Sequence, residues 1–190
     1  KPVLASGMVP EGGVRSMEDS AAVFFGRDPG QVESLLRERK VGFLLLPNPR
    51  DELYNSLGSA PAGTAAPLVL ETDWLRGERV TLAPSFPELV VVRLFFSDGV
   101  SFPGFPALDA YRLVHESRLL SSGLRVNDQQ VKVFEVVPAA VVRLRDLQGG
   151  TRAVLTATVR TNQERTFVWR ATALPDANGV ADLRVPYSVG

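Results

Sequence analysis

The chain has 190 residues, of which 45% are apolar and 22% are charged, and its 21 basic residues balance 21 acidic ones. This length is enough to bury a core in one large domain or two small ones. The charge balance predicts no electrostatic capture of nucleic acid. With no cysteine, disulfides, thiolate catalysis and cysteine-ligated zinc are excluded. No run approaches the ~20 apolar residues that cross a bilayer.

The first clear element is a helix in GRDPGQVESLLRERK, after an irregular segment rich in Gly, Pro and Ser. Asp28 is placed to cap the N-terminus of this helix, Pro29 suits its first position, and Gln31 has capping-box spacing. Val32, Leu35 and Leu36 then contribute one apolar stripe, while Glu33 and the charged residues 37–39 face solvent. The sequence therefore predicts an amphipathic helix that begins at Pro29.

A short apolar strand is predicted next, in VGFLLLP, residues 41–47. A run without polar residues is typical of a strand buried on both faces. A helix followed by such a strand is half of an α/β unit. The residues NPRDELYNSLGS predict a turn that leads into a short helix, and residues 58–67, GSAPAGTAAP, predict a small-residue loop.

The segment SFPELVVVRLFFSDG carries signals of both a strand and a helix. Val90–Val92 and the phenylalanines favour a strand. Against that, Ser85 and Glu88 have capping-box spacing, Pro87 is tolerated in a first turn, and Gly99 stands where a C-terminal cap glycine belongs. We predict a mostly buried helix.

From Tyr111 onward the apolar residues alternate with polar ones at a period of two. Six short strands separated by turn residues favour a β-sandwich or a small barrel. The predicted fold class is α+β, with an N-terminal α/β core-like domain over residues 1–124 and an antiparallel all-β peripheral module over residues 125–190. The strand segments are YRLVHES, QVKVFEVV, AAVVRLRDL, RAVLTATVRTN, RTFVWRATAL and ADLRVPYS, with turns at ND, QGG and DANG.

His115 is the only histidine of the chain. Strand alternation places it on one face with Tyr111 and Leu113, and places Glu116 on the opposite face. A lone histidine cannot build a multi-histidine metal site. We interpret it as a hydrogen-bonded structural residue, with a ligand role as the alternative.

Two pairs of neighbouring carboxylates could serve acid–base chemistry or bind a divalent metal: Glu18 with Asp19, and Asp51 with Glu52. Adjacent side chains diverge unless a turn brings them together, so solvated loop charge is the default interpretation. Asp51 is of more interest because it follows the end of a buried strand, where α/β sites gather.

Trp74 and Trp169 could form platforms that stack on sugars. Trp169 falls within an alternating strand, where packing in the core is the simpler interpretation. Nothing in the sequence amounts to a catalytic constellation. We therefore predict no catalytic residue, no metal ligand and no cofactor in this chain.

Several segments resemble the catalytic-subunit family of oligosaccharyltransferases when they are taken in order. KPVLASGMVPEGG, with DSAAVFFGRDPGQVESLLRERKVGFLLLP, resembles the part that follows the family's W-W-D-Y-G motif. VVVRLFFSDG and YRLVHES resemble its next landmarks, and VKVFEVVPAA and TNQERTFVWRATALPDANGVADLRVPYS resemble its C-terminal β-module. The resemblance covers nearly the whole chain.

The resemblance implies a soluble C-terminal region on the extracytoplasmic face of a membrane, joined to a transmembrane domain of its own parent chain. In that family the transmembrane part holds acidic residues that bind a divalent metal, Mg or Mn. The enzyme transfers an oligosaccharide from a lipid-linked donor to asparagine in an acceptor polypeptide. The soluble part recognises the acceptor sequon. The implied partners are thus the transmembrane domain, the acceptor polypeptide and the lipid-linked oligosaccharide, with no nucleic acid.

The sequence departs from the family in its pocket motifs. It contains no W-W-D-Y-G, and it begins at KPVLASGMVP without an initiator methionine or a signal peptide. We therefore expect Lys1 to follow shortly after that motif in a longer protein. The family's second motif, D-x-x-K or M-x-x-I, would fall in PRDELYNSL, where Asp51 matches the acidic position and Tyr54 stands in place of lysine. The resemblance makes Asp51 the acceptor-side candidate and implies no transferase activity for this chain alone.

Two alternatives remain open at this point. The chain could be a secreted carbohydrate- or protein-binding β-module without an enzymatic parent, an interpretation motivated by the aromatic residues of its β half. It could also come from a related transferase of lipid-linked sugars that modifies something other than asparagine.

Overall fold

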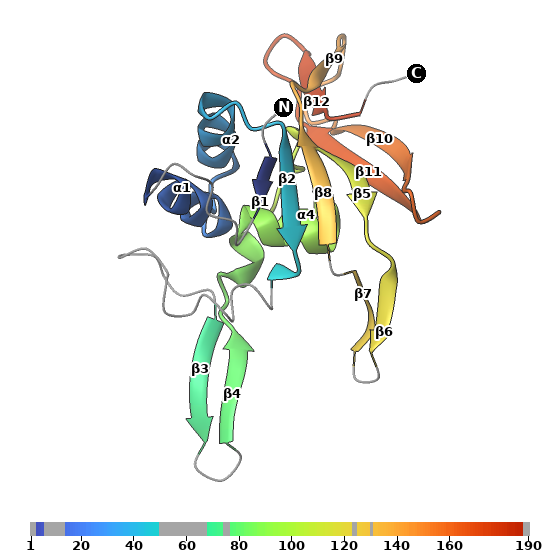
Figure 1. Cartoon of the computed structure of the whole chain (residues 1–190). Coiled ribbons are helices and arrows are strands. Elements are labelled where there is room, and N and C mark those ends of the chain that lie inside the picture. The colour runs from blue at the N-terminus through green and yellow to red at the C-terminus, as the bar shows by residue number, and fades with distance from the viewer. Residues whose placement is uncertain are drawn as a thin grey trace.

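The computed structural model shows helices on one face of a four-stranded sheet, followed by a part made only of strands (Figure 1). This arrangement confirms the α+β fold class predicted from the sequence. The structure describes residues 3–5, 14–49, 68–73, 77–122, 125–129 and 131–187.

The central sheet has the strand order β1-β2-β8-β5. β1 and β2 are parallel, whereas β8 is antiparallel to both of its neighbours. Two consecutive helices connect β1 to β2, as a crossover between parallel strands requires. The strands are β1 (Val3–Ala5), β2 (Phe43–Pro47), β5 (Tyr111–Glu116) and β8 (Val131–Val136), and the helices are α1 (Val14–Phe24) and α2 (Pro29–Glu38).

The N-terminus of α2 is capped as predicted. Oδ1 of Asp28 accepts hydrogen bonds from the backbone N–H of Gly30 (2.8 Å) and of Gln31 (3.3 Å). Pro29, the first helical residue, has no N–H that needs a partner. Val32 and Leu36 are buried, so the predicted apolar stripe faces the core.

One face of the central sheet is buried, and the other is only half-covered among the described residues. On β2, Leu44 and Leu46 are 1% exposed, whereas Phe43, Leu45 and Pro47 are half-buried. The prediction of a strand buried on both faces was therefore wrong for one face. The helices pack against the face of the sheet that carries Leu44 and Leu46. One cluster of buried apolar side chains joins the helices to that face.

The predicted helix in SFPELVVVRLFFSDG is present but shorter than expected. A separate 3-10 turn, η1 (Phe86–Glu88), precedes α4 (Val90–Ser97), because Leu89 between them is extended, with φ −63° and ψ 131°. Ser85 makes no capping hydrogen bond, so the predicted capping box is wrong. Asp98 (φ 52°) and Gly99 (φ 72°) end α4 in left-handed conformation, close to the position predicted for the terminating glycine.

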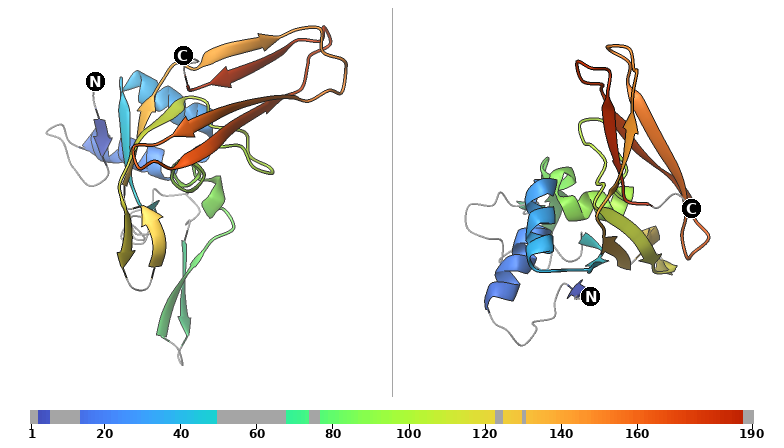
Figure 2. Two further views of the ribbon diagram at one scale, coloured as in Figure 1. Left: turned by 90° about the vertical axis from the view of Figure 1, so that its right-hand side faces the viewer. Right: turned by 90° about the horizontal axis from the view of Figure 1, so that it is seen from above.

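The C-terminal strands form two antiparallel pairs, β10–β11 and β9–β12, that face each other (Figure 2). We call residues 140–187 the β-module. Its core contains buried residues from both pairs, with Trp169 fully buried at its centre, as the alternation predicted. The bounds are β9 (Ala140–Leu144), β10 (Ala153–Arg160), β11 (Thr166–Ala173) and β12 (Ala181–Val185).

All six strands predicted after Tyr111 exist, but they do not lie in one module. β8, assigned from the sequence to the second part, is an inner strand of the central sheet. The boundary between residues 1–124 and 125–190 itself stays a prediction.

Two hairpins were not predicted from the sequence. They are formed by β3 (Leu68–Asp73) with β4 (Gly77–Leu82), and by β6 (Leu119–Ser122) with β7 (Arg125–Gln129). The turn expected at ND lies inside β7. The predicted helix and loop over residues 51–67 fall outside the described residues.

Candidate functional site

A β-bulge near the end of β5 reverses the predicted alternation. The register between β5 and β8 shifts between Leu113 and His115, so one residue of β5 is left over. His115 therefore points to the exposed side, away from the side that buries Tyr111 and Leu113, and Glu116 becomes fully buried. The prediction that His115 shares a face with Tyr111 was wrong for this reason.

Because of the bulge, the side chain of Glu116 points toward three other charged residues. We call these four residues the charge cluster: Asp98, Glu116, Lys132 and Arg165. Each member comes from a different element, namely the C-terminal cap of α4, the end of β5, the start of β8 and the turn between β10 and β11. Glu116, Lys132 and Asp98 are 0%, 3% and 6% exposed. Three buried charges of this kind require close compensation.

Arg165 contacts both carboxylates of the charge cluster. Its Nη1 lies 2.7 Å from Oδ2 of Asp98, and its Nη2 lies 3.0 Å from Oδ1. Its Nη2 also lies 2.7 Å from Oε2 of Glu116, and its Nε donates to both oxygens of Glu116 at 3.1 and 3.2 Å. The guanidinium stacks on the ring of Phe167, 5.0 Å from its centroid. The planar fork thus holds two carboxylates at once, a geometry that lysine cannot reproduce.

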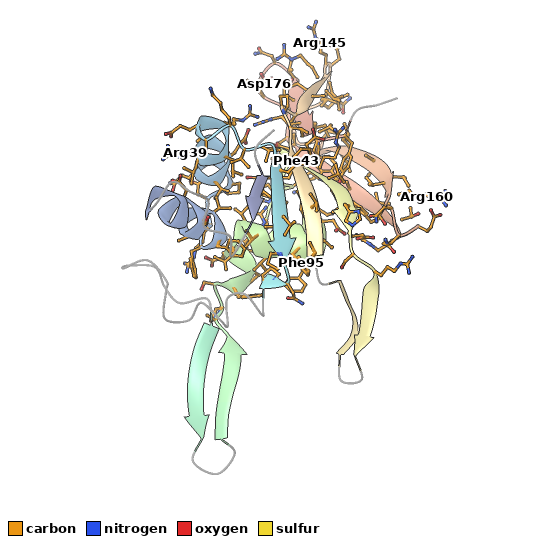
Figure 3. The ribbon with its side chains drawn as sticks, in the orientation of Figure 1. Arg39, Phe43, Phe95, Arg145, Arg160 and Asp176 are labelled. Atoms are coloured by element: carbon orange, nitrogen blue, oxygen red, sulfur yellow. The ribbon has the colours of Figure 1, made fainter. Side chains whose placement is uncertain are left out.

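Lys132 completes the charge cluster from the other side of Asp98. Its Nζ donates to Oδ1 of Asp98 at 2.7 Å and to the carbonyl oxygen of Phe95, in the last turn of α4, at 2.6 Å. The same nitrogen lies 5.4 Å from the centroid of the ring of Phe95, which is labelled in Figure 3. A cation at a helix C-terminus is stabilised by the helix dipole.

The turn between β10 and β11 surrounds Glu116 with further polar contacts. The hydroxyl of Thr161 donates to Oε1 of Glu116 at 2.5 Å. The backbone N–H of Glu116 donates to Oδ1 of Asn162 at 2.8 Å, and Nδ2 of Asn162 donates to the carbonyl oxygen of Glu116 at 3.0 Å. Three side chains of one turn thus converge on the last residue of β5.

The charges of the cluster fix the protonation of its members. Burial alone would raise the pKa of Glu116, but the hydrogen bonds from Arg165 and Thr161 and the positive charges of Arg165 and Lys132 hold this pKa below its usual value. Burial would lower the pKa of Arg165, but both carboxylates raise it. Two cations thus balance two anions, and an ionised Glu116 is poor at taking up a proton. This arrangement suits a structural junction rather than acid–base catalysis.

Three more polar contacts join the β-module to the rest of the chain. The backbone N–H of Leu113 donates to the hydroxyl of Tyr187 at 3.4 Å, at the same free edge of β5. Arg184 on β12 lies 3.3 Å from Glu33 on α2 and 3.6 Å from Asp109, whose pKa is raised by burial. The junction is therefore polar at both ends.

The carboxylate pairs predicted from the sequence do not form a site in the described residues. Asp51 and Glu52 lie outside the described residues, as does the side chain of Glu18. Asp19 forms an ion pair with Arg39, 2.7 Å apart, on the exposed surface beside α2 (Figure 3 labels Arg39). In the part of the chain that the structure describes, no three His, Asp or Glu side chains are grouped to hold a metal ion.

The tryptophans give no exposed platform for a sugar in the described residues. Trp169 is 0% exposed and packs edge-on against Tyr187, with ring centroids 6.3 Å apart. Trp74 lies outside the described residues. Trp169 therefore packs in the core of the β-module and offers no surface to a sugar.

Sequence reasoning missed the charge cluster because alternation places Glu116 on the opposite face. One signal was available. The segments FFSDG, VHES, VKVFE and ERTF, which carry the resemblance described above, each supply one member of the charge cluster.

Comparison with known proteins gives a family match for the β-module and a shared fold for most of the chain. Residues 140–190 match the family model described as the archaeal glycosylation protein B long peripheral domain. No curated protein sequence matches the chain. For the described residues, no helix is long and apolar enough to span a membrane.

Three solved structures share the fold of this chain. The archaeal oligosaccharyltransferase AglB from Archaeoglobus fulgidus, in complex with an inhibitory peptide and a dolichol-phosphate, has a TM-score of 0.66 and 15% sequence identity over 89% of this chain. The Archaeoglobus fulgidus oligosaccharyltransferase in complex with Zn and sulfate has the same values over 89% of this chain. The enzyme tethered to an acceptor peptide containing the NVT sequon has a TM-score of 0.61 and 14% identity, again over 89% of this chain.

The chain spans only a part of these proteins, 28%, 31% and 29% of their respective lengths. The peripheral-domain match and the shared fold agree with each other, and they confirm the resemblance to oligosaccharyltransferases predicted from the sequence.

Proposed function

We propose that this chain is the extracytoplasmic part of a membrane-bound oligosaccharyltransferase that transfers a lipid-linked oligosaccharide to asparagine in an acceptor polypeptide. The observation that carries the proposal is the fold, shared over 89% of this chain with an oligosaccharyltransferase whose structure includes an inhibitory peptide and a dolichol-phosphate. The peripheral-domain match over residues 140–190 supports it independently.

Within this enzyme, the central sheet and its helices would border the acceptor-peptide site, and the β-module would brace them from outside. The charge cluster supports the bracing role, because it fixes the β-module on β5 with compensated charges that offer no reactive group. A pocket needs rigid support to hold its residues in place. Asp51 remains the acceptor-side candidate of this proposal.

The reaction itself would take place on residues outside this chain. The described residues hold no set of ligands that fits a divalent metal, so the Mg or Mn ion implied by the family is assigned to the transmembrane part of the parent chain. When bound there, the metal would supply electrophilic catalysis. The partners of this chain are then that transmembrane part, the acceptor polypeptide and the lipid-linked donor.

The location can be tested with a cysteine reporter, because the chain contains no cysteine. Thr158 is exposed on β10, so Thr158→Cys in the full-length protein is expected to react with a membrane-impermeant maleimide on intact cells. The parent protein without the added cysteine is the control. Labelling that requires lysis of the cells contradicts an extracytoplasmic location.

The activity can be tested with membranes that contain the full-length protein. A peptide with an Asn-x-Thr sequon and a lipid-linked oligosaccharide are expected to give a glycopeptide, whereas the same peptide with Gln in place of Asn gives none. This chain alone is expected to give no product. Turnover by the chain alone, or identical products from the Gln peptide, would overturn the proposal.

A further inference from the structure

We propose that Arg165 is a positioning residue that latches the β10–β11 turn of the β-module onto the end of β5, and that its loss releases this end of the module while both apolar cores stay folded. This goes beyond the proposed function, because it assigns the attachment at the end of β5 to a single turn and makes that attachment separable from folding.

The first support is the convergence of the latch on one short turn. Thr161, Asn162 and Arg165 all reach Glu116, and no strand of the β-module pairs with β5 in the described residues. The turn is already ordered by its own bonds, because the backbone N–H of Thr161 donates to the carbonyl oxygen of Arg165 at 2.9 Å. Figure 3 shows Arg160 at this end of the module, far from Arg145 and Asp176.

The second support is the dependence of Glu116 on Arg165. Arg165 donates three hydrogen bonds to the Glu116 carboxylate, which is 0% exposed. Asp98 loses two bonds with Arg165 but keeps Lys132 at 2.7 Å. Without Arg165, the buried charge of Glu116 is poorly compensated, so the favourable response is to move the turn away and admit water.

The third support is that the fully buried residues of the two cores come from separate stretches of the chain. The buried residues of the sheet-and-helix core lie between Val23 and Phe134, and those of the module core lie between Ala153 and Val185. Phe167 packs against both cores, and Val100 and Ala107, between α4 and β5, pack against the module core. Opening of the latch at the β10–β11 turn therefore leaves the fully buried residues of each core among their own neighbours.

Amide hydrogen exchange on this chain separates a released latch from unfolding. The reporters are the N–H groups of Glu116 and Leu113, which are bonded to side chains of the β-module rather than to a neighbouring strand. In Arg165→Met, exchange at these two amides is expected to be at least about tenfold faster, whereas the β10–β11 and β2–β8 ladders keep their protection.

Two further variants keep this test specific. Glu116→Gln combined with Arg165→Met is expected to regain part of the protection, because a neutral amide does not need a buried cation. Arg170→Met, on the exposed side of β11, makes the same chemical change at an arginine without an ion pair among the described residues, and it is expected to leave exchange unchanged.

Unchanged exchange at Glu116 in Arg165→Met would overturn the proposal, as would equal loss of protection in both ladders or absence of rescue in the double variant. In membranes, Arg165→Met in the full-length protein is expected to lower kcat for glycopeptide formation, with Arg165→Lys between it and the parent. Failure of the transfer assay for the parent itself counts against the proposed function and leaves the exchange result standing.

Discussion

The side-chain amide of Asn162 pairs with both backbone groups of Glu116, accepting from its N–H at 2.8 Å and donating to its carbonyl oxygen at 3.0 Å. These are the two bonds that a neighbouring strand would make with β5 at this position. The β-module therefore covers an exposed strand edge with one side chain instead of a strand. An edge blocked in this way is also protected from pairing with another chain.

Replacement of Asn162 by Ala is expected to destabilise the chain by about 1–3 kcal/mol, because two backbone groups at the edge of β5 lose their partner. Urea unfolding measures this change. Gln163→Ala, at the neighbouring exposed position of the same turn, is the matched control and is expected to change stability by less than about 0.5 kcal/mol. Equal effects of the two substitutions would show that the Asn162 pairing does not contribute.

The stability contributed by Glu116 depends on pH in a defined direction. Its pKa is lower in the folded chain than the ordinary value of 4.5, so the ionised form is favoured by folding. The contribution is complete above pH 4.5 and is lost as the pH falls through the lower pKa of the folded state.

Comparison of the parent with Glu116→Gln isolates this group. The difference between their free energies of unfolding is expected to be largest at about pH 7 and to shrink below pH 4.5, since the titration of all other groups is common to both. If the difference between the two free energies of unfolding stays constant down to about pH 3, the ionised form of Glu116 does not contribute to stability in the way proposed.

The elements of this fold were predictable from the sequence where local patterns determine them. Asp28 and Pro29 define the start of α2, and the alternation around Trp169 places that residue in a core, because these features depend on neighbours within a few residues. The helical course of α4 was also predictable, although its first turn was not, since Leu89 is extended.

Features set by pairing between distant segments were not predictable. The membership of β8 in the central sheet depends on its contacts with β2 and β5, about 90 and 20 residues earlier in the chain. The buried position of Glu116 depends on one extra residue in β5, which the alternation of the sequence does not reveal. The charge cluster depends on the position of β8 in the central sheet and on the bulge in β5. It could therefore not be predicted from the sequence.

Trp169 is expected to be the most sensitive apolar position of the β-module. It is 0% exposed, so Trp169→Ala should cost about 3–5 kcal/mol through lost burial and the cavity that remains. Trp169→Phe should cost less, because Nε1 of Trp169 has no hydrogen-bond partner among the described residues that would be lost. Thermal unfolding measures both, with Val168→Ala, at a position 50% exposed, as the neighbouring control.

A cost of Trp169→Ala that is no larger than that of Val168→Ala would contradict the position of this ring at the centre of the module core. Loss of protection should be concentrated in the β10–β11 and β9–β12 ladders, because the two cores are separate.

Gly99 and Gly104 provide a matched pair for the junction between α4 and β5. Both have a positive φ, 72° and 85°, so alanine at either position is strained by about 1–2 kcal/mol. A Cβ at Gly104 would meet nothing within 4 Å, whereas one at Gly99 would lie 3.3 Å from Cβ of Leu108. Gly99→Ala is therefore expected to cost about 1 kcal/mol more than Gly104→Ala in urea unfolding.

Gly99 also follows Asp98, whose left-handed conformation aims its carboxylate at Lys132 and Arg165. Gly99→Ala should thus speed exchange at the Glu116 amide more than Gly104→Ala does, because strain at residue 99 disturbs the charge cluster and strain at residue 104 does not. Equal exchange at Glu116 in the two variants would show that the end of α4 does not control the geometry of the charge cluster.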